Sequence, residues 1–292
     1  MYKTIKPFIK WAGGKSQLLD IIREKYPEKI EKYCEPFVGG GAVLLDVLEN
    51  FHPKEVMIND INSELINVYM QVRDNVENVI ELLLNMQIAF WKMDNDKRKE
   101  YFYSKRDRFN ELIKQSVSTK EKAALFIFLN KTCFNGLYRV NNKGFYNVPM
   151  GSYKKPLICD TDNLYLISKL LKNVEIRCGD YSNCQDFISN NTFVYIDPPY
   201  RPLSATSSFT SYNKTTFDDE QQIQLVHFIE QISNKGAKVV ASNSDPKNTD
   251  ENDNFFDDIY KMFIINRITA KRMINSNSKG RGYINELLIC NY

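Results

Sequence analysis

The sequence predicts an α/β protein with a Rossmann-like, doubly wound, mostly parallel seven-stranded sheet and a helical insertion domain that ends in a β-hairpin. Two observations predict this fold. Short runs of β-branched and aromatic residues alternate with helical patterns, and a long middle stretch has no strand pattern. With 292 residues, the chain is long enough for one large α/β domain with a sizeable insertion.

Seven short, mostly continuous segments have the pattern of strands covered on both faces. They span residues 32–39, 55–60, 174–180, 192–197, 238–244, 262–268 and 285–292. Helical patterns separate them: GAVLLDVLEN follows the first strand, and a second helix precedes KVVASNS. In this second helix, Asp218 or Asp219 is a suitable N-cap and Gly236 is a suitable C-terminal stop. The alternation favours parallel strands joined by helical crossovers.

Residues 63–169 interrupt the alternation with successive helical patterns. They are followed by GLYRVNNKGFYNVPMG, in which two aromatic and β-branched runs flank a turn at 141–144. We therefore expect residues 1–62 and 170–292 to form the α/β domain. Residues 63–169 should form a helical domain with a β-hairpin at about 135–149.

Positive charge is concentrated in this insertion. Residues 97–155 contain fourteen Lys and Arg but only four acids, a net charge of +10 in a chain whose total is +3. A basic module set into a mildly acidic scaffold is typical of proteins that bind a polyanion such as nucleic acid. A solvated helix face rich in lysine has the same composition, so charge alone leaves both interpretations open.

Several classes of protein are disfavoured by the composition. No apolar run approaches the ~20 residues of a membrane span, and MYKTIKPFIKWAGGKS lacks the apolar core of a signal peptide. The six cysteines are scattered without the spacing of a zinc site. We expect reduced thiols in a cytoplasmic protein that needs neither a membrane nor a metal.

EPFVGGGAVLLDVL places a glycine-rich turn between a strand and a helix. Gly39 and Gly41 allow a sharp turn and the close approach of a ligand. Leu44 stands where a dinucleotide fingerprint has a third small residue, so a nucleoside without a pyrophosphate fits better, and a simple tight turn is the alternative. Asp60 ends the next strand 21 residues after Gly39, where an acid can bind ribose hydroxyls. Together these features predict a nucleoside site.

KWAGGKS has a superficial likeness to a phosphate-binding P-loop. That motif requires a glycine five residues before Gly14, where Ile9 stands, and this segment precedes the first strand instead of following one. The pattern therefore disfavours an ATPase, although Lys15 could pair with a ligand carboxylate.

YIDPPY ends a buried strand with four residues that suit neither a strand nor a helix. Asp197 supplies carboxylate oxygens, while Pro198 and Pro199 remove N–H donors and leave carbonyl acceptors on a stiff turn. Tyr200 offers a flat ring on which a base can stack. Acceptors beside an aromatic ring suit the exocyclic amine of a nucleobase, which must be flipped out of a duplex to reach them.

The motifs KWAGGKSQLL, EPFVGGGAVLL, INDIN and YIDPPY, joined by FNGLYRVNNKGFYNVPMGSY, resemble the Dam-type, alpha-class D12 family of DNA adenine-N6 methyltransferases. The resemblance runs from about Pro7 to Tyr292 and is nearest to the GATC-modifying enzymes of restriction systems. It implies transfer of a methyl group from S-adenosylmethionine to N6 of a flipped-out adenine in double-stranded DNA. A cognate restriction endonuclease acting separately is a possible partner.

The resemblance also implies roles for individual residues. The residues expected to line the donor site are Trp11, Lys15, Phe37, Gly39, Gly41, Asp60, Asp180 and Asp197. Those expected to hold the target adenine for catalysis are Asp197, Pro198, Pro199 and Tyr200. Those expected to contact DNA are Lys10, Asn135, Tyr138, Arg139, Lys279 and Arg281. For the last two, a solvated loop is the equal alternative to a phosphate contact.

Two alternative functions remain at this stage. A cytosine-C5 methyltransferase needs a nucleophilic cysteine after a proline, and none of the six cysteines follows one. Cytosine N4 also bears an amine, so a cytosine-N4 DNA methyltransferase is the closest chemical rival. The other alternative is a catalytically inactive relative that only binds DNA, and the intact acceptor corner argues against it.

Overall fold

The computed structural model describes residues 5–201, 217–271 and 283–292. Lys279 and Arg281 lie outside the described residues. The strands are β1 Lys32–Glu35, β2 Glu55–Asp60, β3 Val174–Cys178, β4 Thr192–Ile196, β5 Lys238–Ser244, β6 Ile264–Lys271 and β7 Tyr283–Cys290. The α-helices are α1 Leu19–Arg23, α2 Ala42–Asn50, α3 Ser63–Asp74, α4 Val76–Lys92, α5 Asn95–Lys114, α6 Lys120–Thr132, α7 Thr161–Leu171, α8 Asp219–Asn234 and α9 Phe255–Ile259. Short 3-10 turns include η1 Lys15–Gln17, η2 Phe134–Gly136, η3 Tyr181–Cys184 and η5 Pro246–Asn248.

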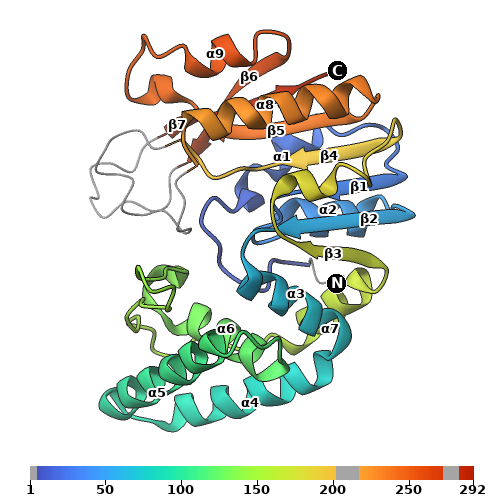
Figure 1. The fold of residues 1–292 in the computed structure, drawn as a ribbon. Coiled ribbons are helices and arrows are strands. Elements are labelled where there is room, and N and C mark those ends of the chain that lie inside the picture. The colour runs from blue at the N-terminus through green and yellow to red at the C-terminus, as the bar shows by residue number, and fades with distance from the viewer. Residues whose placement is uncertain (1–4, 202–216, 272–282) are drawn as a thin grey trace.

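The seven strands form one sheet in the order β3-β2-β1-β4-β5-β7-β6 (Figure 1). Pairing is parallel from β3 to β5, whereas β7 runs antiparallel to both β5 and β6. The predicted α/β fold with a mostly parallel seven-stranded sheet is therefore confirmed. The chain passes from β1 outward to β2 and β3 and then returns to β4 on the other side of β1. The crevice at such a reversal is where open α/β sheets bind ligands.

Local sequence signals explain the elements beside this crevice. All five residues of β4 are buried, as expected for a central strand covered by helices on both faces (Figure 1). Helix α8 begins with a capping box in which Asp218 accepts from the backbone of Gln221, and Gln221 accepts in return from Asp218. Gly236, with φ of 91°, follows the end of α8 as predicted.

The helical region lies at the end of the molecule away from β6 and α9 (Figure 1). Helix α3 packs beside β2 and β3, α7 packs against α2 and α3, and α4 and α5 pack on α6. One hydrophobic cluster includes Val43 and Ile58 of the α/β part as well as Phe102, Phe109 and Phe128 of the helices. Because this core is continuous, the expected division at residues 62 and 169 stays a prediction.

The predicted hairpin is an irregular loop around one tight turn. Gly144 donates from its backbone N–H to the carbonyl of Asn141 over 2.8 Å, which closes the turn. The two arms share single bridges, Val140 with Tyr146 and, at the base, Cys133 with Met150, instead of a continuous ladder.

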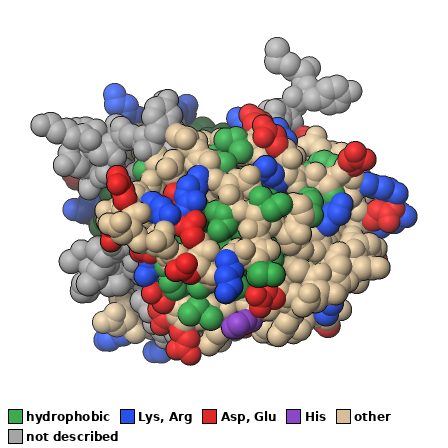
Figure 2. Space-filling view, turned by 90° about the horizontal axis from the view of Figure 1, so that it is seen from above, with side chains coloured by type: hydrophobic (Ala, Val, Ile, Leu, Met, Phe, Trp, Pro, Cys, Tyr) green, Lys and Arg blue, Asp and Glu red, His purple; other side chains and the backbone are tan. Residues whose placement is uncertain are grey.

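Part of the positive charge in residues 97–155 is used inside the fold. Arg98 donates to the backbone carbonyls of Phe90, Trp91 and Lys154. Lys122, only 4% exposed, lies 2.7 Å from a carboxylate oxygen of Glu64. The face at the top of Figure 1, seen from above in Figure 2, has acidic and basic side chains interspersed. A polyanion would meet mixed charge on the described residues there.

No helix in the described part of the chain is long and apolar enough to cross a membrane.

Candidate functional site

Acidic residues gather where the parallel strands end. Glu35 is the last residue of β1, Asp60 is the last of β2, and Asp197 directly follows β4. Asp180 follows β3, two residues beyond Cys178, which pairs with Asp60 in register. Because the carboxyl ends of parallel strands share one edge of the sheet, these acids face the crevice beside β1.

The glycine turn after β1 is built to exclude side chains. Gly39 and Gly41 have φ values of 46° and 70°, in the left-handed region that favours glycine. A Cβ atom on Gly41 would lie 2.4 Å from the hydroxyl oxygen of Tyr69, and one on Gly39 would lie 2.9 Å from Cδ1 of Trp11. The structure thus brings Trp11 over the glycine turn, and its place in a donor site stays a prediction.

Asp60 binds this turn from the next strand. Its Oδ2 accepts the backbone N–H of Gly39 over 3.1 Å, and its Oδ1 accepts that of Asn62 over 2.9 Å. Burial raises the pKa of Asp60 to about 6, although the backbone N–H groups oppose this shift. A ligand that donates hydrogen bonds to the ionised carboxylate would offset the cost of burying it.

Phe37 and Asp180 lie on the two loops that flank Asp60. The ring of Phe37 lies 5.4 Å from that of Tyr181, measured between centroids, and Asp180 is exposed and caps η3 by accepting from Ser182 over 3.0 Å. Asn59, 1% exposed, ties the two loops together by donating to the carbonyls of Pro36 and Gly179.

Sequence reasoning missed Asn59, and the available signal was a polar residue inside the apolar strand EVMIND. Its Oδ1 has no hydrogen-bond partner among the described residues.

The carboxylate of Asp197 is held by a buried cation. Nζ of Lys15 lies 2.8 Å from both carboxylate oxygens and also donates to the carbonyl of Gly13 over 2.8 Å. Lys15 is 4% exposed, so the ion pair is largely removed from water. Ser242 donates to Oδ1 of Asp197 over 3.0 Å. Lys15 therefore pairs with Asp197, the predicted catalytic residue. If Lys15 also contacts a carboxylate of the donor, it must do so while bound to Asp197.

The ring of Tyr200 is fixed from the opposite edge of the crevice. Its hydroxyl donates to Oε2 of Glu286 on β7 over 2.9 Å, and Nζ of Lys15 lies 4.9 Å from its ring centroid. Burial raises the pKa of Glu286, and Lys15 and Tyr200 oppose that shift. Sequence reasoning missed Glu286, an isolated acid at the start of the apolar run ELLIC.

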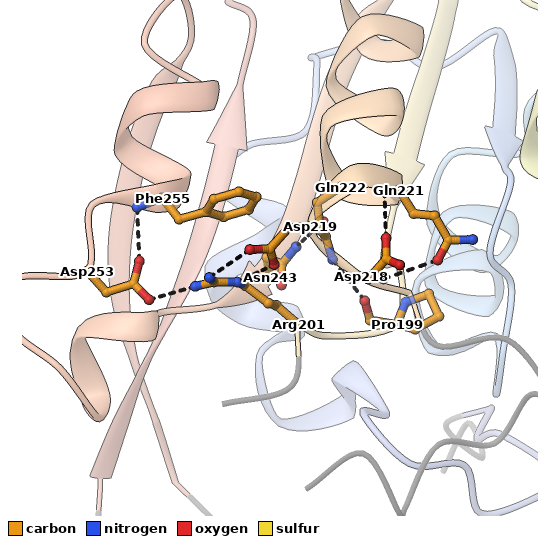
Figure 3. Close-up of polar contacts among 9 residues, drawn as sticks. All are labelled: Pro199, Arg201, Asp218, Asp219, Gln221, Gln222, Asn243, Asp253 and Phe255. Atoms are coloured by element: carbon orange, nitrogen blue, oxygen red, sulfur yellow. Dashed lines mark hydrogen bonds and ion pairs between the residues drawn. The ribbon is translucent and has the colours of Figure 1, made fainter. Parts of the chain in front are cut away.

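The two prolyl carbonyls differ in their partners. The carbonyl of Pro199 accepts a hydrogen bond from Nε2 of Gln222 over 3.1 Å (Figure 3). The carbonyl of Pro198 accepts no hydrogen bond from a described residue. The Pro198 oxygen, which has no such partner, is therefore the candidate acceptor beside Asp197.

Several residues predicted to contact DNA lie together on the other side of Trp11. Lys10 packs on the turn η2, where a Cβ atom on Gly136 would lie 2.3 Å from its Cδ. Asn130, 2% exposed, accepts from the backbone N–H of Lys10 and donates to the carbonyls of Lys10 and Gly136. Asn135 is exposed, with φ of 56°. Phe134, which sequence reasoning missed, is 53% exposed in the same turn.

Tyr138 and Arg139 are neighbours in sequence with different surroundings. Tyr138 is 6% exposed, and its ring centroid lies 5.7 Å from that of Trp11 and 5.1 Å from that of Phe126, while Trp11 and Phe126 are themselves 6.3 Å apart. Its predicted place beside a flipped base stays a prediction, because this ring belongs to the core. Arg139 is exposed, and its Nε donates to Oδ1 of Asn147 over 2.8 Å across the hairpin.

Comparison with known proteins gives the family. The D12 class N6 adenine-specific DNA methyltransferase family matches residues 11–274. The chain belongs to this family.

The chain is also 48% identical to the type II methyltransferase M.MjaIII of Methanocaldococcus jannaschii, with 99% of each chain covered. It is 40% identical to the type II methyltransferase M1.LlaDCHI of Lactococcus lactis subsp. cremoris, with 99% of this chain and 96% of the relative covered. It is 35% identical to the DNA adenine methylase of Serratia marcescens, with 98% of each covered.

The match confirms that the protein is an adenine-specific DNA methyltransferase of the D12 class. It spans the glycine turn, the acceptor corner and the helical region, whereas Lys10 and Glu286 lie just outside it. The described residues contain no group of three or more His, Cys, Asp or Glu side chains that could hold a metal ion.

The surroundings of Asp60 predict a specific pH dependence of stability. Because its pKa is raised from 3.8 to about 6 in the folded protein, the folded state binds more protons than the unfolded chain between these values. The contribution of Asp60 to the free energy of unfolding is therefore full below pH 4 and is lost as the pH rises through 6, by about 1 to 3 kcal/mol.

Urea denaturation of wild type and of Asp60→Asn from pH 4 to pH 7 tests this. The free energy of unfolding of the variant should fall less between pH 4 and pH 7 than that of wild type. The difference between the two pH profiles gives the contribution of Asp60 apart from the other acids. An equal pH dependence of the free energy of unfolding in both proteins would contradict a raised pKa of Asp60.

Proposed function

We propose that this adenine-specific DNA methyltransferase takes its methyl group from S-adenosylmethionine and transfers it to N6 of a flipped-out adenine in double-stranded DNA, within GATC. The observation that carries the proposal is the corner after β4. There, the anchored carboxylate of Asp197 and the unoccupied carbonyl of Pro198 lie beside the ring of Tyr200. Two acceptors next to an aromatic plate suit an adenine amine.

The donor site suits a nucleoside. Asp60, placed at the end of β2 and bonded to the Gly39 turn, would hold the ribose hydroxyls. Gly39 and Gly41 with the covering Trp11 would let the donor lie against backbone, and Phe37 with Asp180 would flank its adenine ring. S-adenosylmethionine supplies a methyl group on a positively charged sulfur, so no nucleophilic side chain is needed.

The acceptor corner would act on the amine. The lone pair of N6 is drawn into the adenine ring, so the amine is a weak nucleophile. Hydrogen bonds from its two N–H groups to Asp197 and to the Pro198 carbonyl would favour a more tetrahedral nitrogen and stabilise the positive charge that develops on it. Lys15 and Ser242 would hold the carboxylate in one orientation. The amine proton can then leave to water.

The DNA would be read by the segment on the far side of Trp11. Lys10, Asn135 and Arg139 are exposed and lie on the N-terminal segment, on η2 and on the hairpin that packs with them. Lys279 and Arg281 are expected to contact phosphate. Recognition of GATC, a separate restriction endonuclease and a cytoplasmic location are further parts of the proposal, and they rest on the resemblance of the motifs to GATC-modifying enzymes of restriction systems.

Labelled S-adenosylmethionine and unmethylated plasmid DNA test the proposal directly. We expect label on N6-methyladenine after base analysis, and modified-base sequencing should place it within GATC. Label on cytosine would favour the cytosine-N4 alternative. Donor binding without any transfer would favour an inactive DNA-binding relative.

Asp197→Asn should lower the methyl-transfer rate by about 100-fold or more, because the amine loses its charged acceptor while the side chain keeps its shape. DNA binding, measured by fluorescence anisotropy, should stay near wild type. Ser242→Ala removes one bond to the carboxylate but keeps its charge, so it should lose much less activity. A transfer rate of Asp197→Asn equal to that of wild type would refute the role of Asp197.

Arg139→Ala should weaken discrimination at a single guanine by about 1 to 3 kcal/mol, because a bidentate contact to one base is lost. The measurement is the transfer rate on a set of duplexes with one substituted base pair each. Lys143→Ala, at the exposed tip of the same hairpin, is the matched control and should affect all duplexes equally. A uniform loss for Arg139→Ala would show that it contacts only the backbone of DNA.

A further inference from the structure

We propose that Gln222 and Asn243 are positioning residues for methyl transfer, because they hold the Pro199 carbonyl and thereby aim the Pro198 carbonyl at the target amine. The inference rests on the proposed role of the corner at Asp197. It concerns a buried chain of amides behind that corner, which no part of the proposed mechanism uses (Figure 3).

The amides form a chain with a fixed direction. Nδ2 of Asn243 on β5 donates to Oε1 of Gln222 over 3.1 Å, and Nε2 of Gln222 on α8 donates to the carbonyl of Pro199 over 3.1 Å. Oδ1 of Asn243 accepts the backbone N–H of Ser244 over 2.9 Å, which turns its Nδ2 toward Gln222. Each amide therefore sets the orientation of the next, and the last donor faces Pro199.

Because these amides are buried, each one destabilises the fold unless its hydrogen bonds are made. Gln222 is 0% exposed and Asn243 is 1% exposed. Leu225 and Ile229 occupy the same buried side of α8, where a leucine in place of Gln222 would pack without any polar requirement. An unsatisfied buried amide costs about 1 to 3 kcal/mol, so a polar pair at this place needs a reason other than packing.

The held carbonyl constrains its neighbour. The ring of Pro199 fixes φ, so the two peptide planes on either side of its Cα can differ only through ψ. Holding the Pro199 oxygen therefore limits how far the Pro198 oxygen can turn. Arg201 secures the chain on the other side, since it lies 2.6 Å from carboxylate oxygens of both Asp219 and Asp253 (Figure 3).

The same bond also holds the Pro199 oxygen toward α8. Releasing that oxygen would loosen the corner. A 1 Å displacement of a reacting group can lower a rate by about 100-fold.

Two adjacent glutamines provide a matched test. Gln222→Met removes the donor to Pro199 and keeps the length of the side chain. Gln221→Met removes the capping bond to Asp218 at the start of the same helix and leaves Pro199 untouched. For both variants and wild type we would measure the single-turnover rate of methyl transfer, the dissociation constants of donor and DNA, and the stability in urea.

We expect Gln222→Met to transfer methyl about 10- to 100-fold more slowly, with both dissociation constants within about twofold of wild type. Gln221→Met should lose stability but keep the wild-type rate. A wild-type rate for Gln222→Met, or rates that follow stability alone in both variants, would overturn the inference. Failure of wild type to methylate adenine would instead refute the proposed function itself.

Gln222→Glu provides a second test, the pH dependence of the methyl-transfer rate, which would not change if Gln222 had only a structural role. Its ionised carboxylate can still accept from Asn243 but presents an oxygen to the Pro199 carbonyl, whereas its protonated form can donate to it. The rate of this variant relative to wild type should therefore rise as the pH is lowered. A ratio that does not change with pH would overturn the inference, even where Gln222→Met fails to fold.

Discussion

The ion pair between Lys15 and Asp197 is the interaction on which the rest of the site depends. It joins the segment before β1 to the end of β4, 182 residues later, with both carboxylate oxygens 2.8 Å from the ammonium nitrogen. Burying two charges is costly, and removing Asp197 would leave the 4% exposed ammonium of Lys15 without its charged partner. This ion pair fixes the orientation of the Asp197 carboxylate. It also holds the N-terminal segment across the glycine turn.

The electrostatics of the crevice follow from the same pair. Glu35, Asp60 and Asp197 end three neighbouring strands, and burial with the nearby charge of Asp197 raises the pKa of Glu35 well above its usual range. Tyr33 stabilises Glu35 by donating to it over 2.7 Å. Lys15 offsets part of this negative charge. Asp60 differs from Glu35, because burial alone raises its pKa and the backbone N–H groups around it oppose that shift.

The features that could be predicted from the sequence are those that depend on local residue patterns and on the order of the strands. The strands follow from continuous apolar runs, and the meeting of Gly39 with Asp60 follows from their spacing along one strand–helix–strand unit. Lys15 was assigned to the donor, because nothing local indicates a partner 182 residues away. Gln222 and Glu286 were missed for a related reason. Each is one polar residue among apolar neighbours, and its hydrogen-bond partner, Pro199 or Tyr200, lies on a loop that only the tertiary fold brings to it.

Trp11 links the two halves of the site. A side chain on Gly39 or Gly40 would meet Trp11 at 2.9 to 3.1 Å, and Trp11 also stacks on Tyr138 of the hairpin arm, 5.7 Å away between centroids, and on Phe126, 6.3 Å away. Tyr138 in turn stacks on Phe126 of α6. Because interiors pack without spare volume, a ligand that displaces Trp11 from the glycine turn must also displace Tyr138. The glycine turn and the hairpin that carries Arg139 are therefore linked through one set of aromatic contacts.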